Sequence, residues 1–205
     1  KVDEYLYQKR GIHITTLKHP NGFEWLMFEE PKQGKSSMET RQRLEIPLYG
    51  NGWPSMKVRL CTSQLKANLI HREVKRIKGE CEVCHYIGIA ADEPKRIKDK
   101  QYPLADWGIT ESEALQICYD RGYDWGGLYE TYHRCSCWCC PMQRIGGLRN
   151  LRRRHPELWE RLLAMDRRAL AQFGNSLPGH FKENWTVGQL EGRFAAEDAQ
   201  LSFFA

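Results

Sequence analysis

Hydrophobic positions recur every three or four residues over much of this chain, which predicts helices that each pack through one apolar face. The predicted helices span residues 1–10, a basic stretch from about 63 to 79, residues 111–121, a stretch that begins at Pro156, and a short C-terminal segment. Two of them carry a capping box, in which a threonine pairs with the Glu or Gln three residues later. These pairs are Thr110 with Glu113 and Thr186 with Gln189.

Two shorter runs have the pattern of strands. Residues 12–17 are rich in β-branched side chains, and residues 86–90 form an unbroken apolar run bounded by polar residues. The second pattern is typical of a strand buried on both faces. Residues 32–42 are polar and contain Gly34, which predicts a mobile surface loop, and residues 50–54 have strong turn chemistry.

Composition then narrows the class of protein. The chain has 205 residues and a mass of 24.1 kDa, with 41% hydrophobic and 28% charged residues, which excludes a disordered or collagen-like chain. No apolar run approaches the roughly 18 residues that span a bilayer, and no signal-peptide pattern is present, so we expect no membrane partner and a cytoplasmic location. The net charge of +5 mildly favours anionic partners.

Eight cysteines form the most informative feature of the composition, and half of them fall within residues 135–140. Secreted folds spread their cysteines to join distant loops, whereas crowding into Cys-x-x-Cys pairs indicates metal binding or thiol redox chemistry in a reducing compartment. Buried structural thiols are the remaining alternative. The positions are Cys61, Cys81, Cys84, Cys118, Cys135, Cys137, Cys139 and Cys140.

Five segments occur along the chain in a characteristic order. They are Gly52-Trp53-Pro54; Arg59-Leu60-Cys61-Thr62 with Leu65-Lys66; the run from Tyr86 to Arg96; Tyr102-Pro103-Leu104 with Trp107-Gly108 and Thr110-Glu111; and Cys137-Trp138-Cys139-Cys140-Pro141. Together they resemble the phosphoadenosine phosphosulfate (PAPS) reductase family, especially its phage and bacterial reductase-like members, within the adenine-nucleotide α-hydrolase superfamily. The resemblance extends from the first residue to about Trp159.

The resemblance implies an α/β fold, a twisted and mostly parallel sheet with helices on both faces. It would occupy residues 1–150, with residues 151–205 as a C-terminal helical extension. Family members carry a Ser-Gly-Gly-x-Asp-Ser phosphate loop on an N-terminal strand, and this sequence opens in mid-helix without that loop. We therefore expect the first strand and the phosphate loop to be missing upstream.

The resemblance also places an anionic substrate among Arg59, Lys66, Lys95 and Arg96, with Asp92 and Glu93 beside them. Guanidinium groups suit this role because they bind sulfate or phosphate oxygens in a bidentate way. The alternative for Lys95 and Arg96 is an ordinary solvated loop. The adjacent carboxylates either bind Mg²⁺ alongside a nucleotide or cap a turn.

For a metal site, the resemblance to assimilatory adenylylsulfate reductases implies Cys61, Cys137 and Cys140 as ligands. Cys118 is the expected fourth ligand, with Cys135 and Cys139 as rivals. The bound group is a 4Fe–4S cluster or a tetrahedral zinc ion. Cys81 and Cys84 form a redox pair, part of a second metal site, or two structural thiols.

The leading functional hypothesis is a PAPS reductase-like enzyme, an oxidoreductase or sulfurtransferase acting on an adenylylated or sulfur-bearing nucleotide. A reductase of this kind would draw electrons from a thioredoxin-like partner or from the cluster. One alternative is a sulfur-insertion enzyme that modifies DNA or tRNA, served by the basic run of Arg149, Arg152, Arg153 and Arg154. The other is a non-catalytic, metal-stabilised nucleotide-binding module.

Overall fold

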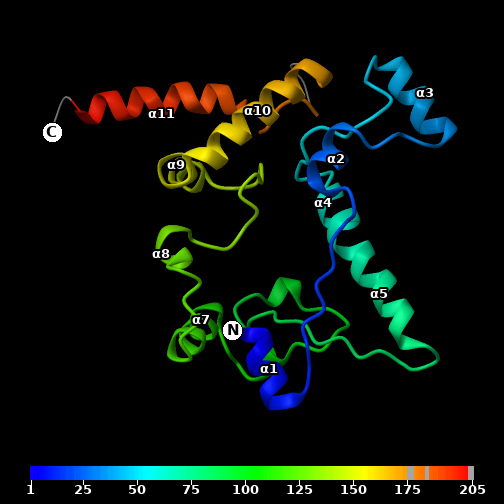
Figure 1. Cartoon of the computed structure of the whole chain (residues 1–205), viewed down its shortest axis with the longest axis vertical. Helices are drawn as coiled ribbons and strands as arrows, with labels where there is room; N and C mark the ends of the chain where they lie inside the picture. Colours follow the sequence, from blue (N-terminus) through cyan, green and yellow to red (C-terminus); the bar gives the residue numbers. More distant parts are fainter. Residues whose placement is uncertain (175–177, 183–184, 203–205) are drawn as a thin grey trace. The chain divides into compact units, whose positions relative to one another are not determined.

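Helices joined by irregular segments make up the chain in the computed structural model, which describes residues 1–174, 178–182 and 185–202 (Figure 1). The helices predicted from the hydrophobic spacing are confirmed, and both capping boxes form. The helical elements are α1 (Val2–Arg10), α2 (Gly22–Phe28), α3 (Lys35–Arg43), α4 (Leu60–Thr62), the π-helical turn η1 (Ser63–Ala67), α5 (Asn68–Lys78), the 3₁₀ turn η2 (Pro94–Arg96), α6 (Pro103–Asp106), α7 (Glu111–Asp120), α8 (Leu128–Thr131), α9 (Ile145–Arg154), α10 (Pro156–Phe173) and α11 (Val187–Ser202).

The predicted α/β fold is wrong, because the described residues form no sheet. Their β pairing is limited to isolated bridges, which join Pro31 to Tyr49, Tyr86 to Gln101 and Lys182 to Trp185. A parallel sheet needs several adjacent strands to satisfy the backbone N–H and C=O groups along each edge. Residues 86–90 have one bridging residue as a partner, at Gln101.

The local geometry explains why the segment at 86–90 does not become a strand. The N–H of Ile87 donates to the carbonyl of Gln101, and the N–H of Gln101 donates to the carbonyl of His85. The pairing then ends because Pro103, which has no backbone N–H, begins α6 two residues later. Ile89 and Ala90 are buried, but Tyr86 is 71% exposed.

The predictions for residues 12–17 and 32–42 are also wrong. Residues 12–17 fold back on α1: Asp3 accepts from the N–H of Ile14 at 2.5 Å, and the His13 ring stacks on Tyr7 with centroids 4.3 Å apart. The segment around residue 40 is helical as α3, which begins after Gly34. Its Lys, Met, Glu, Arg and Gln residues are good helix formers, so polarity alone was a poor indicator of a loop.

The chain divides into two compact units, and each has its own packing. The first unit contains residues 1–75 and 160–205, and the second contains residues 76–159. In the first unit, α2 lies along α10: Arg161 pairs with Glu24, Arg168 pairs with Glu29 and lies 4.3 Å over the Phe28 ring, and Gln172 donates to the Phe28 carbonyl. Fully buried side chains there include Phe28, Leu162, Leu190 and Phe194.

A tight loop at residues 50–53 closes the first unit against α2. The N–H groups of Asn51 and Gly52 donate to the Met27 carbonyl, and Trp53 packs edge-on against Phe181 at 4.9 Å. Gly52 has φ +66, and a Cβ at this position would lie 2.4 Å from the Pro178 carbonyl oxygen. The turn predicted from Gly-Asn-Gly-Trp-Pro therefore exists, and it needs glycine for space as well as for conformation.

The second unit contains η2, α6, α7, α8 and α9, together with the loop that carries the clustered cysteines. The residue boundary predicted after position 150 falls inside α9.

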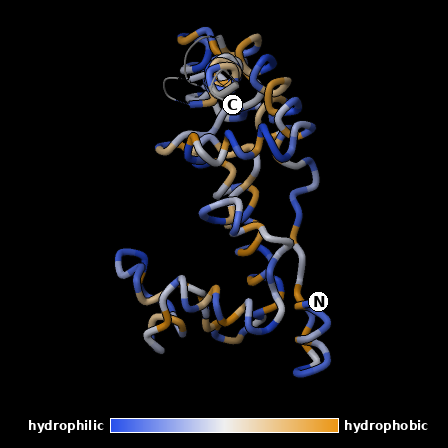
Figure 2. The backbone as a smooth tube through the Cα atoms, turned by 90° about the vertical axis from the view of Figure 1, so that its left-hand side faces the viewer, coloured by the Kyte–Doolittle hydropathy of each residue, from blue (hydrophilic) through white to orange (hydrophobic). Residues whose placement is uncertain are grey.

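Figure 2 shows hydrophobic and hydrophilic residues interleaved along the helices. In the part of the chain that the structure describes, no helix combines the length and the apolar character needed to cross a bilayer.

Candidate functional site

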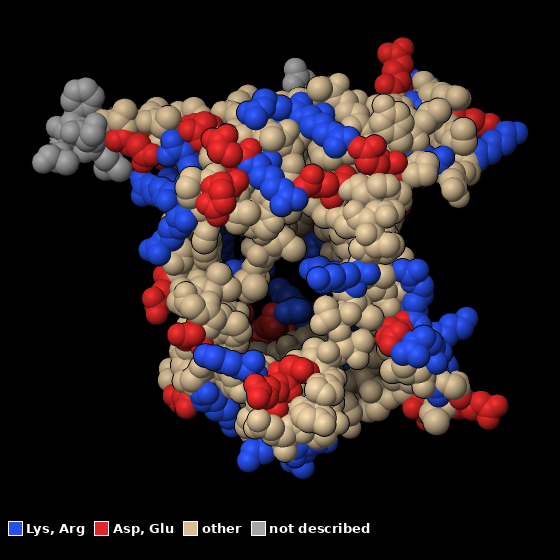
Figure 3. Space-filling view, in the orientation of Figure 1, with Lys and Arg blue, Asp and Glu red and all other residues tan. Residues whose placement is uncertain are grey.

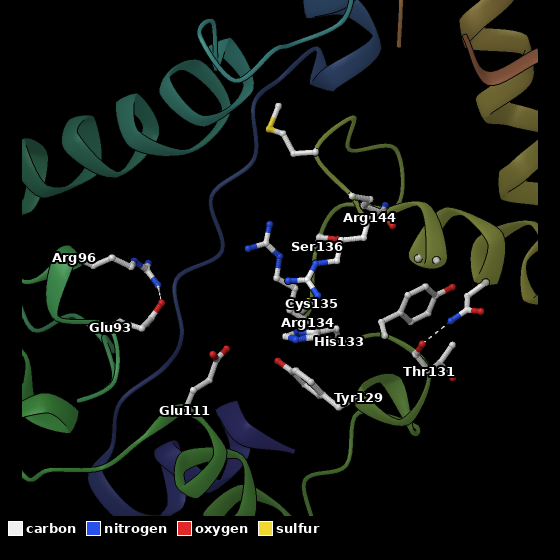
Figure 4. A pocket seen from close by; sticks show the side chains of 16 residues that line it. Glu93, Arg96, Glu111, Tyr129, Thr131, His133, Arg134, Cys135, Ser136 and Arg144 are labelled. Carbon is white, nitrogen blue, oxygen red and sulfur yellow. Dashed lines mark hydrogen bonds and ion pairs between the residues drawn. The ribbon is translucent and has the colours of Figure 1, made fainter. Parts of the chain in front are cut away.

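A cavity of about 770 Å³ in the second unit is a candidate site (Figure 4). Four segments supply its walls: the η2 turn, the start of α7, residues 129–136 around the end of α8, and the start of α9. The residues that line it include Glu93, Arg96, Glu111, Tyr129, Tyr132, His133, Arg134, Cys135, Gln143, Arg144, Gly146 and Gly147.

Two of the three arginines that line this cavity make no ion pair with a described residue. Arg96 is paired with Glu93, with Nη1 and Oε1 2.5 Å apart. The guanidinium groups of Arg134 and Arg144 make no hydrogen bond or ion pair with any residue that the structure describes. Glu111, the carboxylate at the opposite wall, likewise has no side-chain partner within that part of the chain. Two free arginines therefore face one free carboxylate.

The start of α9 adds to this positive character. Arg144 is the N-cap residue, no side chain caps the helix, and no acidic residue occupies its first turn. Gly146 and Gly147 line the cavity there, so the backbone of the first turn is not covered by their side chains. A helix N-terminus carries a partial positive charge and free N–H donors, both of which favour an anion.

Two tyrosines line the cavity, and both are neutral. Burial raises the pKa of Tyr129, and electrostatic interactions with nearby acidic groups, which include Glu111, raise it further. Burial also raises the pKa of Tyr132, whose hydroxyl is enclosed and has no hydrogen-bond partner among the described residues. The Tyr132 ring is held in place by stacking on His155, with centroids 6.4 Å apart. Both hydroxyls stay protonated at neutral pH, and that of Tyr129 can donate to a ligand.

The substrate residues predicted from the sequence belong to two units, and four of them lie in the second. Glu93 and Arg96 line the cavity, and Lys95 lies exposed on η2 between them. Asp92 takes the capping role, because its Oδ1 accepts from the N–H of Glu111 at the start of α7. Glu93 is thus paired with Arg96 while one oxygen of Asp92 caps α7, and Mg²⁺ binding by this carboxylate pair stays a prediction.

The other two predicted substrate residues belong to the first unit. Arg59 is the N-cap residue of α4 and contacts the Met56 sulfur at 3.4 Å, and Lys66 lies in η1. The resemblance grouped them with Lys95 and Arg96 because of motif order. The structure places each pair in a different unit.

Two of the four predicted metal ligands are adjacent in space. Cys137 and Cys140 form a turn in which the Cys140 N–H donates to the Cys137 carbonyl at 3.0 Å. Gln143 braces this turn, because its Nε2 donates to the carbonyls of Cys137 and Trp138 at 2.7 and 2.8 Å. Cys139, between the two ligands, is only 8% exposed.

The other two predicted ligands come from different segments of the chain. Cys61 belongs to the first unit, and Cys118 lies on α7 in the wall of a neighbouring cavity. Within the described ranges, no three His, Cys, Asp or Glu side chains are grouped closely enough to hold a metal ion. The cluster or zinc ion therefore stays a prediction, and we derive no chemical step through it.

The remaining cysteines and the basic run have separate positions. Cys135 lines the main cavity beside Arg134, while Cys81 and Cys84 are exposed. The basic residues fall on α9, where Arg149, Arg152 and Arg153 each interact with other groups of the protein. On the face drawn in Figure 3, Lys and Arg side chains are interspersed with Asp and Glu.

Sequence reasoning missed Arg134, Arg144 and Tyr129 as cavity residues. A usable signal existed for Arg144, which precedes Ile-Gly-Gly at the start of a helix, a pattern compatible with anion binding. No local signal marked Arg134 or Tyr129, because their roles depend on how the loop after α8 folds.

Comparison of this chain with family models, with curated proteins and with solved structures gave no match.

Proposed function

We propose that the second unit binds an adenylylated or sulfur-bearing nucleotide in the cavity of about 770 Å³, through a phosphate or sulfate group held by Arg134 and Arg144. The observation that carries this proposal is that both guanidinium groups line one cavity and lack a partner among the described residues. A guanidinium fork matches the oxygens of either anion in a bidentate way.

The electrostatics of the cavity support an anion in particular. The Arg96–Glu93 pair is neutral overall, so Arg134 and Arg144 outnumber the one free carboxylate, Glu111. The first turn of α9 contributes donors with partial positive charge beside them. Hydrogen bonds to charged groups contribute about 1.5–3 kcal/mol each, and we take the lower end because both arginines are exposed.

The reaction that follows binding rests on the sequence resemblance alone. Under this proposal, reductive release of sulfite with a thioredoxin-like reductant, or transfer of sulfur, would act on the group bound at Arg134 and Arg144. A cysteine-bound cluster or zinc also stays a prediction, for which the Cys137–Cys140 turn would supply two thiols. The sheet that the resemblance implied has no part in this proposal.

Calorimetric titration of the 205-residue chain with adenosine 5′-phosphosulfate, AMP and uncharged adenosine tests the proposal. We expect Arg134→Gln and Arg144→Gln each to weaken binding of the two anionic ligands about tenfold, since about 1.4 kcal/mol corresponds to a factor of ten. Binding should also weaken with added salt. Arg121→Gln is the matched control, because Arg121 is an exposed arginine of the same unit whose Nη1 donates to the Ile117 carbonyl.

Two results would contradict the proposal. One is adenosine binding as tightly as AMP, since the anion would then contribute nothing. The other is an Arg134→Gln variant that binds AMP as tightly as the wild type and the Arg121→Gln control do.

A further inference from the structure

A second cavity of about 430 Å³ adjoins the first, and its chemistry is different. Glu111, Tyr129 and His133 line both cavities, so a single ligand can extend from one into the other. The second cavity adds Trp125 from the loop before α8 and Asp92 from the loop before η2. None of the described residues that line it is Lys or Arg, so it does not suit an anion.

An aromatic wall forms one side of this second cavity. Trp125 and Tyr129 meet edge to face, with ring centroids 5.6 Å apart and planes at 70°, and Tyr119 lies 6.5 Å behind. Trp125 is 49% exposed despite its size, so part of its indole is open to a ligand. Trp125 has φ +50, and the loop is tied down by the Gly126 N–H donating to Asp124 Oδ1. The conformation of this loop therefore sets the orientation of the Trp125 side chain.

Hydrogen-bond acceptors form the other side. The Glu111 carboxylate has no partner within the described part of the chain, and Glu111 lines this cavity as well as the first one, where Figure 4 shows it near the Tyr129 hydroxyl. Asp92 uses one carboxylate oxygen to cap α7. A ligand that satisfies Glu111 must donate hydrogen bonds, and one that uses Trp125 should be planar or apolar.

We infer that the second cavity holds the base of the same nucleotide, a purine with an exocyclic amino group stacked on Trp125 and donating to Glu111. This inference rests on the proposed function, because the anionic end of the ligand lies at Arg134 and Arg144. The paired cavities match the two ends of such a molecule: cations for the phosphate or sulfate, and an aromatic wall with a carboxylate for the base. Base stacking on an aromatic side chain strengthens binding by about tenfold or more.

The test compares three probes on the full chain by calorimetric titration: AMP, IMP, which lacks the amino group, and ribose 5-phosphate, which lacks the base. We expect the wild type to bind AMP at least tenfold more tightly than ribose 5-phosphate, and more tightly than IMP. Trp125→Leu should weaken AMP about tenfold and leave ribose 5-phosphate unchanged, while Trp125→Phe should restore part of the loss. Glu111→Ala should abolish the preference for AMP over IMP without weakening ribose 5-phosphate.

Trp107→Leu serves as the matched control, because Trp107 is an exposed tryptophan of the same unit, 71% accessible, that does not line this cavity. Retained binding of ribose 5-phosphate shows that each variant is folded. Equal affinity of the wild type for AMP and ribose 5-phosphate would overturn the base site and leave anion binding intact. Equal loss of both ligands in Trp125→Leu would also overturn it. Failure of the wild type to bind any of the three would overturn the proposed function and this inference together.

Discussion

Replacing Gln143 with leucine removes the brace from the Cys137–Cys140 turn. The Gln143 amide donates to the carbonyls of Cys137 and Trp138 at 2.7 and 2.8 Å, and leucine can make neither hydrogen bond. With about 1 kcal/mol for each bond, local opening of the turn becomes easier by about 2 kcal/mol, or roughly 30-fold. Cys139, which is 8% exposed, reacts only when the turn opens, so its alkylation should accelerate by about that factor.

The assay is native-state alkylation with iodoacetamide on chelator-treated protein, with each cysteine located by peptide mass spectrometry. The exposed thiols of Cys81 and Cys84 are internal references whose rates should not change. Gln143→Glu should have a larger effect than Gln143→Leu, because a carboxylate would face the two carbonyl oxygens. Gln116→Leu is the control, since it removes an exposed glutamine that donates to Asp120 on α7.

Two outcomes would refute this reasoning. Unchanged alkylation of Cys139 in Gln143→Leu would show that the two hydrogen bonds do not hold the turn closed. A parallel increase at half-buried Cys118 would show that the whole unit opens.

Two further predictions concern a buried carboxylate and the metal hypothesis. Burial raises the pKa of Asp166, whose Oδ2 accepts from the N–H groups of Val187 and Gly188 at the start of α11. Folding therefore favours the protonated carboxyl. As the pH rises through the raised pKa, the free energy of unfolding of the wild type, measured with urea, should fall relative to that of Asp166→Asn. A difference between the two proteins that does not change with pH would contradict this. If the Cys137–Cys140 turn supplies ligands, replacing both cysteines with serine should remove most of the bound metal from the purified chain, as measured by elemental analysis. Replacing Cys81 and Cys84 should leave the metal in place, and a wild type that contains no metal would refute the hypothesis.

Helices could be predicted from this sequence because their signals are local. The threonine at position 110 and the glutamate three residues later cap α7 through contacts within one turn, and Gly11 ends α1 with φ +65. Such interactions depend on neighbours three or four residues away, which the sequence displays directly. The strands at 12–17 and 86–90 failed for the opposite reason. A strand needs a partner elsewhere in the chain, and an apolar run does not show whether that partner exists.

The residues of the candidate site likewise fall into those that local sequence indicates and those that depend on the tertiary structure. Glu93 and Arg96 were identified because they share one short segment with a recognisable motif, and they do line the cavity. Arg134 and Arg144 lie ten residues apart and face the same space only because the loop after α8 returns to the start of α9. Their importance comes from the lack of a protein partner, and pairing is a property of three-dimensional arrangement.

By itself, the sequence determined the helices predicted from hydrophobic spacing and the two capping boxes. Each depends on backbone geometry within a few residues. Only the tertiary structure decided that the described residues form no sheet, that residues 1–75 pack with 160–205, and that cations and an aromatic wall occupy adjoining cavities. These outcomes depend on which distant segments bury one another, since burial and pairing are set by the whole chain and not by local spacing.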